Sequence, residues 1–148
     1  MGFSTSGAAA ILFIGLLLAV GIAYPTLEAA HDRRATAIDD RDQRALDVRN
    51  TAIAVDAAVY DADAETLTLD VTNTGSTTLS VPETDLLIDG VYRTGYETAV
   101  SGDATRTLWQ SGETLSMTVQ LEPNADPERA KVVTQHGVAA TITDVEVS

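Results

Sequence analysis

Three acidic side chains alternate along one short segment and could together bind a hard cation. Asp61, Asp63 and Glu65 are spaced two residues apart between two strand-like runs, and carboxylate oxygens at such spacing suit calcium. The segment lacks the glycine and the terminal glutamate of a twelve-residue calcium loop. It is therefore a weak ion-site candidate, and a solvated acidic turn is the favoured interpretation.

The histidines and cysteines give no basis for catalysis. His31 and His136 are the only histidines, and neither has a serine motif or a carboxylate pair at a defined spacing. The chain has no cysteine, which excludes disulfides, thiolate catalysis and cysteine-ligated metals. The sequence predicts a protein that is not an enzyme, with no catalytic residue, no cofactor and no metal that it requires.

An aromatic and cationic segment is the best candidate for contact with another protein. Tyr92, Arg93 and Tyr96 lie in one strand-like, glycine-containing stretch, and tyrosine and arginine are enriched at interfaces. A half-exposed edge strand without a partner explains the same pattern equally well. The single tryptophan, Trp109, is expected in the core, although tryptophan is also common at interface hot spots.

The elements that must position these side chains are strands, because apolar residues from position 52 onward recur with a period of two. Strands are expected at 52–60, 65–73, 77–81, 85–89, 91–97, 105–110, 114–121 and 129–147, the last divided at His136 and Gly137. No helical pattern interrupts them. The sequence therefore predicts a mainly β head at residues 52–148, an immunoglobulin-like antiparallel β-sandwich. A phase shift at Thr143 and Asp144 predicts a bulge.

The head is preceded by an uncharged, apolar N-terminus. A helix from residue 7 to residue 24 would rise about 27 Å, close to the roughly 30 Å hydrocarbon core of a bilayer. No basic residue precedes Arg33, which argues against a cleaved secretory signal. Residues 1–25 are therefore predicted to form a retained transmembrane anchor.

Residues 26–51 are predicted to continue as a charged helical stalk. Their sparse apolar stripe, Leu27, Ile38 and Leu46, continues to Ile53. A stripe this thin could support a coiled coil with a partner helix, but a solvated spacer is the favoured interpretation.

The charge of the head limits its partners. Residues 52–148 carry sixteen acidic and four basic residues, a net charge of −12, which disfavours nucleic acid and anionic lipid surfaces. The whole chain has 14 Asp, 8 Glu, eight Arg and a single Lys. Dense surface carboxylates cost little repulsion at high salt, so the composition predicts a halophilic, archaeal protein.

Several motifs, taken in order, resemble those of a known family. They are Met1-Gly-Phe-Ser-Thr-Ser-Gly7 before the apolar run, Leu69-Asp-Val-Thr-Asn-Thr-Gly-Ser76, Leu87-Ile-Asp-Gly90, Trp109-Gln-Ser-Gly-Glu113 and Arg129-Ala-Lys-Val-Val-Thr-Gln-His-Gly137. In this order they are similar to the archaeal flagellar (archaellum) accessory proteins FlaF and FlaG of the flagellin-like family, with the order closer to FlaF.

The resemblance implies a membrane-anchored, single-pass stator component of the archaellum motor. Its head would lie in the pseudoperiplasmic space, bind the S-layer protein and associate with copies of itself or with FlaG-like accessory proteins. One pattern opposes this placement: five arginines follow the apolar run and none precedes it, so the positive-inside rule favours a cytoplasmic head.

Two other functions stay open. The first is an archaellin-like or pilin-like filament subunit, which requires processing after a basic residue just before the apolar run. The second is an envelope module that binds a ligand or an ion, which requires a convergent polar pocket.

Overall fold

The computed structural model describes residues 2–123 and 125–148, and the side chains at positions 2–5, 23 and 25–27 are not described. The predicted boundary between anchor and stalk and the stripe residue Leu27 therefore lie outside the described side chains. The chain divides into two compact units, Met1–Gln43 and Arg44–Ser148.

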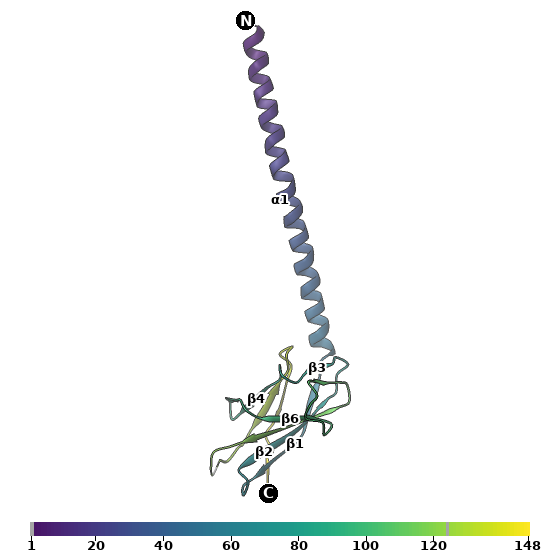
Figure 1. The fold of residues 1–148 in the computed structure, drawn as a ribbon, viewed down its shortest axis with the longest axis vertical. Coiled ribbons are helices and arrows are strands. Elements are labelled where there is room, and N and C mark those ends of the chain that lie inside the picture. Colours follow the sequence, from purple (N-terminus) through teal and green to yellow (C-terminus); the bar gives the residue numbers. More distant parts are fainter. Residues whose placement is uncertain (1, 124) are drawn as a thin grey trace. The chain divides into compact units, whose positions relative to one another are not determined.

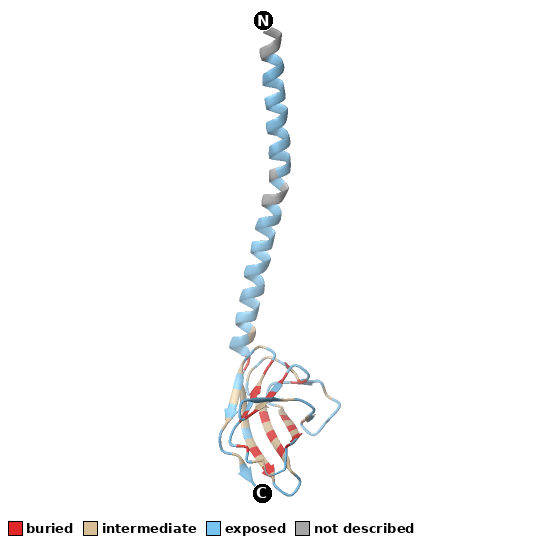
Figure 2. Ribbon diagram, turned by 90° about the vertical axis from the view of Figure 1, so that its left-hand side faces the viewer, coloured by how far each residue is buried: buried red, intermediate tan, exposed pale blue. Residues whose placement is uncertain are grey.

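A single α-helix, α1, runs from Gly2 to Asn50 and supplies the whole first unit (Figure 1). After Pro25 it contains neither glycine nor proline, and alanine and arginine, which favour helix, are frequent there. The side chains described along it are almost all exposed (Figure 2). Residues 26–50 of the predicted stalk lie within this helix, and their role as a stalk stays a prediction.

The transmembrane prediction for residues 1–25 is not confirmed. Among the residues that the structure describes, no helix is both long enough and apolar enough to cross a membrane.

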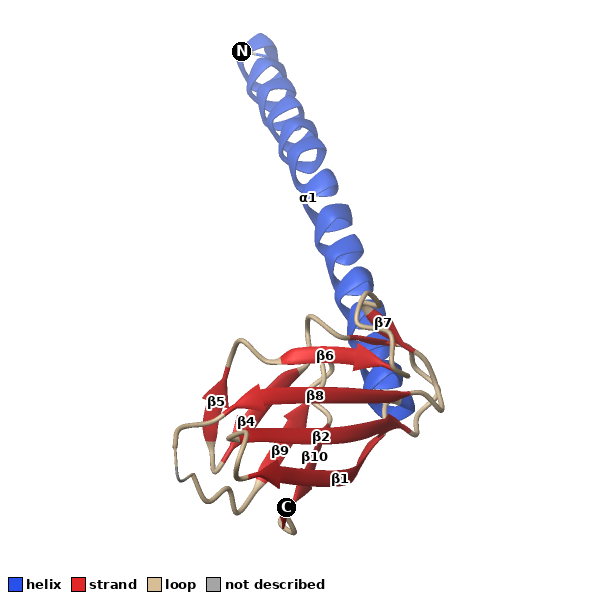
Figure 3. Cartoon of the chain, turned by 60° about the horizontal axis from the view of Figure 1, so that its bottom comes forward, coloured by secondary structure: helices blue, strands red, loops and turns tan. Residues whose placement is uncertain are grey.

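The described residues of the second unit form eleven strands in three sheets. The large sheet has the order β11-β1-β2-β8-β6 and consists of β1 (Ile53–Asp61), β2 (Thr66–Asn73), β6 (Glu97–Val100), β8 (Thr114–Gln120) and β11 (Glu146–Val147). The small sheet has the order β10-β9-β4-β5 and consists of β4 (Asp85–Ile88), β5 (Val91–Arg93), β9 (Ala130–Val133) and β10 (Ala139–Ile142). A third sheet pairs β3 (Leu79–Ser80) with β7 (Leu108–Trp109). The two larger sheets face each other (Figure 3).

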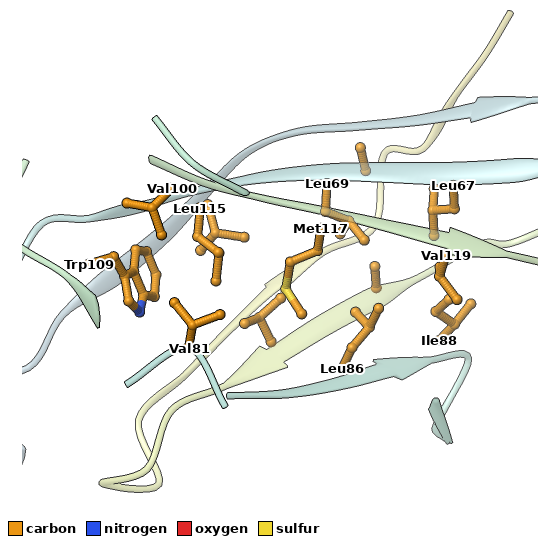
Figure 4. Close-up of a cluster of buried hydrophobic side chains, with 14 of the residues drawn as sticks. Leu67, Leu69, Val81, Leu86, Ile88, Val100, Trp109, Leu115, Met117 and Val119 are labelled. Atoms are coloured by element: carbon orange, nitrogen blue, oxygen red, sulfur yellow. The ribbon is translucent and has the colours of Figure 1, made fainter. Parts of the chain in front are cut away.

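The core lies between these two sheets (Figure 4). Alternate residues of β2 and β8 are buried, which is the pattern expected for strands with one face on the core. The core side chains of the large sheet include Leu67, Leu69, Val71, Leu115, Met117 and Val119, and those of the small sheet include Leu86, Ile88, Ala130 and Val132. The mainly β, sandwich part of the prediction is confirmed, and the immunoglobulin-like subclass stays a prediction.

The strand predicted at 91–97 is wrong, because the chain changes sheets within it. β5 ends at Arg93 in the small sheet, and β6 begins at Glu97 in the large sheet. Gly95 lies between them with a φ of 76°, a left-handed conformation that breaks a strand. The periodicity of the sequence does not reveal such a change of sheet, because the segments on both sides of Gly95 are extended.

The C-terminal segment also differs from the prediction. Thr143 and Asp144 do not form a bulge but separate β10 from β11, where the chain passes from the small sheet to the large one. β11 then pairs parallel with β1, so the sandwich is not antiparallel throughout. The irregularity in register lies instead in β1, between Val55 and Ala57.

Candidate functional site

The three predicted interface residues lie around the beginning of β4 and its hairpin partner β5. The hairpin turns at Asp89 and Gly90, whose φ angles are 52° and 84°. Positive angles at both central residues are typical of the tight turns that match strand twist. This turn sets the register of β5, in which Leu87 lies opposite Tyr92 and Leu86 opposite Arg93.

Tyr92 is exposed on the outer side of the small sheet. Its side chain is 56% exposed, and its hydroxyl donates to Asp85 Oδ1 at 3.1 Å. The hydrogen bond to Asp85, and then the negative charge of that carboxylate, raise the pKa of Tyr92. The ring is thus held against the sheet surface while most of its area stays open to solvent.

Tyr96 has a structural role in this arrangement. Its hydroxyl donates to the backbone carbonyl of Thr84, and its ring packs against the core. Burial, followed by the proximity of Tyr92 and Asp85, raises its pKa. Tyr96 therefore fixes the crossing between β5 and β6 to the beginning of β4 and presents little surface to a partner.

Arg93 faces the same side of the small sheet as the fully buried Leu86. Its Nε atom is buried and has no hydrogen-bond partner. As an interface, the set of Tyr92, Arg93 and Tyr96 stays a prediction, and Tyr92 is its exposed member.

The predicted weak ion site forms a self-bonded turn. Asp61 Oδ1 accepts hydrogen bonds from the backbone N–H groups of Asp63 at 3.0 Å and Ala64 at 2.9 Å, the Asx-turn geometry typical of aspartate. Glu65 follows with a φ of 57°. Within residues 2–123 and 125–148, no group of three potential ligands is placed to hold a metal ion.

The two histidines lie in separate units, His31 on α1 and His136 in the turn before β10. The Nε2 atom of His136 lies 3.2 Å from the side-chain nitrogen of Gln135. An amide neighbour neither activates a nucleophile nor tunes a general base. An open hollow of about 910 Å³ combines Arg129 with four carboxylates from Asp89, Asp126, Glu128 and Asp144.

Sequence reasoning missed the joint that holds the end of α1 to the head. The carbonyl of Asn50 accepts the N–H of Ser76 at 2.9 Å, and the carbonyl of Ala52 accepts the N–H of Gly75 at 2.9 Å. The last carbonyls of a helix have no partner within it, so the loop after β2 caps the helix. The last turn of α1 belongs to the same compact unit as the head.

Gly75 is the residue that permits this close approach. A Cβ atom at position 75 would lie 2.5 Å from the backbone nitrogen of Ala52, and nearer still to the carbonyl oxygen of Asn50. Real side chains do not approach backbone atoms so closely. The sequence signal was present in Asn73-Thr-Gly75, but it indicated only a turn.

Asn73 holds the same loop from inside the head. Its side chain is completely buried. The amide nitrogen donates to the carbonyls of Thr77 at 2.8 Å and Trp109 at 3.3 Å, and the amide oxygen accepts the N–H of Gly75 at 3.1 Å. A buried polar side chain is stabilising only when it is bonded in this way. Trp109 is fully buried, which confirms its predicted place in the core.

A bidentate ion pair lies next to this joint and connects the two ends of the segment between β6 and β8 that contains β7. Arg106 donates to Glu113 through two nitrogens, at 2.6 and 2.8 Å, and Glu113 also accepts the N–H of Gln110 at 2.7 Å. The bond from Arg106, and then the one from Gln110, lower the pKa of Glu113. Of the cations described in the head, Arg106 alone has a salt bridge.

Comparison with known proteins identifies a family and several similar folds. The model of the archaeal-type flagellin family matches residues 2–144. No curated protein sequence matches the chain. The archaellum periplasmic stator protein FlaG from Sulfolobus acidocaldarius is 19% identical over 62% of this chain and 97% of its own, with a TM-score of 0.47.

Two further solved structures are similar at a lower level. The stator complex of FlaF and FlaG from the same organism is 19% identical over 61% of this chain and 85% of that chain, with a TM-score of 0.44. The ligand-binding region of serine-glutamate repeat protein A from Enterococcus faecium is 13% identical over 67% of this chain and 97% of its own, with a TM-score of 0.41.

Proposed function

Because the chain belongs to the archaeal-type flagellin family, we propose that it is a structural, stator-like component of the archaellum. Its N-terminal helix anchors it in the cell membrane as a single pass, and its head lies in the pseudoperiplasmic space. There the head binds the S-layer protein and associates with copies of itself or with FlaG-like accessory proteins. The three parts are the anchor at residues 1–25, the stalk at 26–51 and the head at 52–148.

The apolar surface of α1 carries this proposal. Nine large apolar side chains between Ile11 and Ile22 are each at least 56% exposed in the isolated chain. They follow one another so densely that they surround the helix rather than form a stripe. A helix that is apolar on all sides requires an apolar environment, and a lipid bilayer provides one for a single chain.

The head has the features of a structural module. Its core is a cluster of buried apolar side chains, an open hollow on it is lined mainly by carboxylates, and its net charge of −12 suits an acidic surface in high salt. These features support a non-enzymatic role in a halophile and give nucleic acid no basic surface to bind.

We infer the side of the membrane on which the head lies from the proposed stator role, although the charge pattern favours the opposite side. Residues 28–51 contain five arginines, and no basic residue precedes the apolar run, which by itself favours a cytoplasmic head. Six acidic residues accompany these arginines, but acids contribute little to that rule. We place the head outside because a component that joins a motor to the cell envelope must meet the envelope there.

A filament subunit is the second candidate function, and the flagellin family match favours it. In a filament the apolar helix would pack against neighbouring helices, which would bury the same exposed apolar side chains. The two functions differ in whether the N-terminal segment is removed by a peptidase. A filament subunit is processed before the apolar run, whereas a membrane-anchored stator component retains its N-terminal segment.

We therefore expect the protein isolated from native membranes to retain its N-terminal segment. Intact-protein mass spectrometry should give the mass of the full sequence, or that mass less Met1. A mass lacking several residues at the N-terminus would favour the filament subunit and contradict the stator assignment. Peptide mapping with a protease provides the control, because it shows whether any shortening occurs at the other end.

A further inference from the structure

Two cations lie together on the outer face of the small sheet. Lys131 of β9 lies opposite Leu87 of β4 and Thr141 of β10, and both of its chain neighbours are fully buried, so its side chain points away from the core. Arg129 immediately precedes β9, and its Nη2 atom lies 3.7 Å from the position that a Cβ of Gly90 would occupy. These five residues line a hollow of about 250 Å³, here called the basic hollow.

The basic hollow has no carboxylate of its own. The head carries sixteen acidic and four basic residues, yet none of the acidic ones lines this hollow. Within the part of the chain that the structure describes, neither Arg129 nor Lys131 forms a salt bridge. Two cations without a local counter-charge create a positive potential, which attracts the carboxylates of a partner.

A second hollow of opposite charge adjoins the first. It is the open hollow of about 910 Å³, here called the acidic hollow, and its charged residues besides Arg129 are Asp89, Asp126, Glu128 and Asp144. Asp89 shapes the border, because its Oδ1 accepts the backbone N–H groups of Glu128 at 3.2 Å and Arg129 at 2.9 Å. Since Arg129 lines both hollows, a positive and a negative region share one continuous surface.

A surface divided in this way is complementary to itself. In a two-fold interface each contact occurs twice, with the roles of the two copies exchanged. An axis beside Arg129 would set the basic hollow of each copy against the acidic hollow of the other, so opposite charges would meet in both contacts. A uniformly acidic or basic surface of another protein would match one hollow and be repelled by the other. The charges therefore favour a second copy of this chain as the partner.

The net charge of the head opposes this contact only at low salt. Two heads of net charge −12 repel each other, but at 1 M salt the Debye length is roughly 3 Å, which screens charges that lie farther apart. Ion pairs enclosed in an interface are screened much less. High salt should therefore remove the repulsion between the heads and leave the paired charges effective.

We propose that two copies of the head associate about a two-fold axis through this surface, with Arg129 and Lys131 of each copy in contact with the acidic hollow of the other. Tyr92 lies opposite Leu87 on the same face and is 56% exposed, so it adds an aromatic contact at the border. The inference rests on the proposed function, because it identifies the surface used for self-association. Its test needs neither cells nor an archaellum, so the two can fail separately.

The test exchanges charges between two variants of the full chain. Lys131→Glu makes the basic hollow acidic, and Asp144→Lys places a cation in the acidic hollow. Each preparation, in nonionic detergent micelles and 1 M salt, carries a donor or an acceptor dye on Ser148→Cys, the only thiol of a chain without cysteine. Energy transfer measures association. Each charge variant alone should associate at least about tenfold more weakly than the protein without it, because its changed contact occurs twice.

A mixture of Lys131→Glu with Asp144→Lys should restore the association. In the mixed pair the new glutamate faces the new lysine, and the second contact keeps its original charges. Glu97→Lys is the matched control, since it makes the same change of charge on β6 of the large sheet, and it should not restore association with Lys131→Glu. Equal urea midpoints, read from the fluorescence of Trp109, would show that all variants fold.

Three results would overturn the proposal. The first is an absence of energy transfer between unmodified chains at 1 M salt. The second is transfer that neither charge variant weakens, which would assign the association to another surface such as α1. The third is a mixture of Lys131→Glu with Asp144→Lys that associates no better than the mixture with Glu97→Lys.

Discussion

Replacing Gly75 by alanine is expected to destabilise the head by about 3 kcal/mol. The added methyl group would overlap the backbone of Ala52 and the carbonyl of Asn50. Neither can move easily, because both belong to the hydrogen bonds that cap the helix. Urea unfolding of the full chain, followed by the fluorescence of the buried Trp109, measures the loss as a lower midpoint.

Gly95→Ala is the matched control for this substitution. Gly95 has a φ of 76° and nothing within 4 Å of the position of an added Cβ, so its cost is backbone strain alone, about 1–2 kcal/mol. If Gly75→Ala cost no more than Gly95→Ala, the close approach of loop and helix end would be wrong.

Placing two aspartates in the apolar part of α1 should release the protein from membranes. In the double variant Ile14→Asp with Leu17→Asp, each charge near the middle of the run costs about 2.5–3.5 kcal/mol in a bilayer. The combined cost should exceed what keeps a single helix inserted. Flotation with lipid vesicles, or extraction of membranes with carbonate, measures the fraction that stays bound.

The control places the same charges in the stalk. Ile38 and Leu46 are 59% and 55% exposed on the same helix, and Ile38→Asp with Leu46→Asp should leave membrane binding unchanged. Loss of binding in both double variants would indicate a general defect of the helix. Retention in both would contradict the membrane anchor and leave the apolar run to a protein partner.

The strands with strict alternation could be predicted from the sequence. β1, β2 and β8 lie close to the predicted 52–60, 65–73 and 114–121, because each buries one face and a period of two follows directly. The short strands were less predictable. β5 and β6 were predicted as one strand, because the sequence pattern does not show that the chain changes sheets at Gly95 between two extended segments.

The candidate site was predictable only in part. Tyr92 and Arg93 could be identified from their residue types, but the sequence could not show that Tyr96 is engaged by Thr84 or that the Arg93 Nε lacks an acceptor. Both depend on how β5 is set against β4. The joint at Asn73 and Gly75 was missed because its partners lie more than twenty residues away, at the end of α1.

The most direct test of the stator assignment is the accessibility of the head to protease on sealed cells. Proteinase K is added to spheroplasts whose intact membrane is verified by protection of a cytoplasmic protein, and antibodies against the head and against an N-terminal tag follow the cleavage. The account predicts that the head is degraded while a short membrane-bound N-terminal fragment survives. A head that stays intact until the membrane is opened would place it in the cytoplasm and contradict the account.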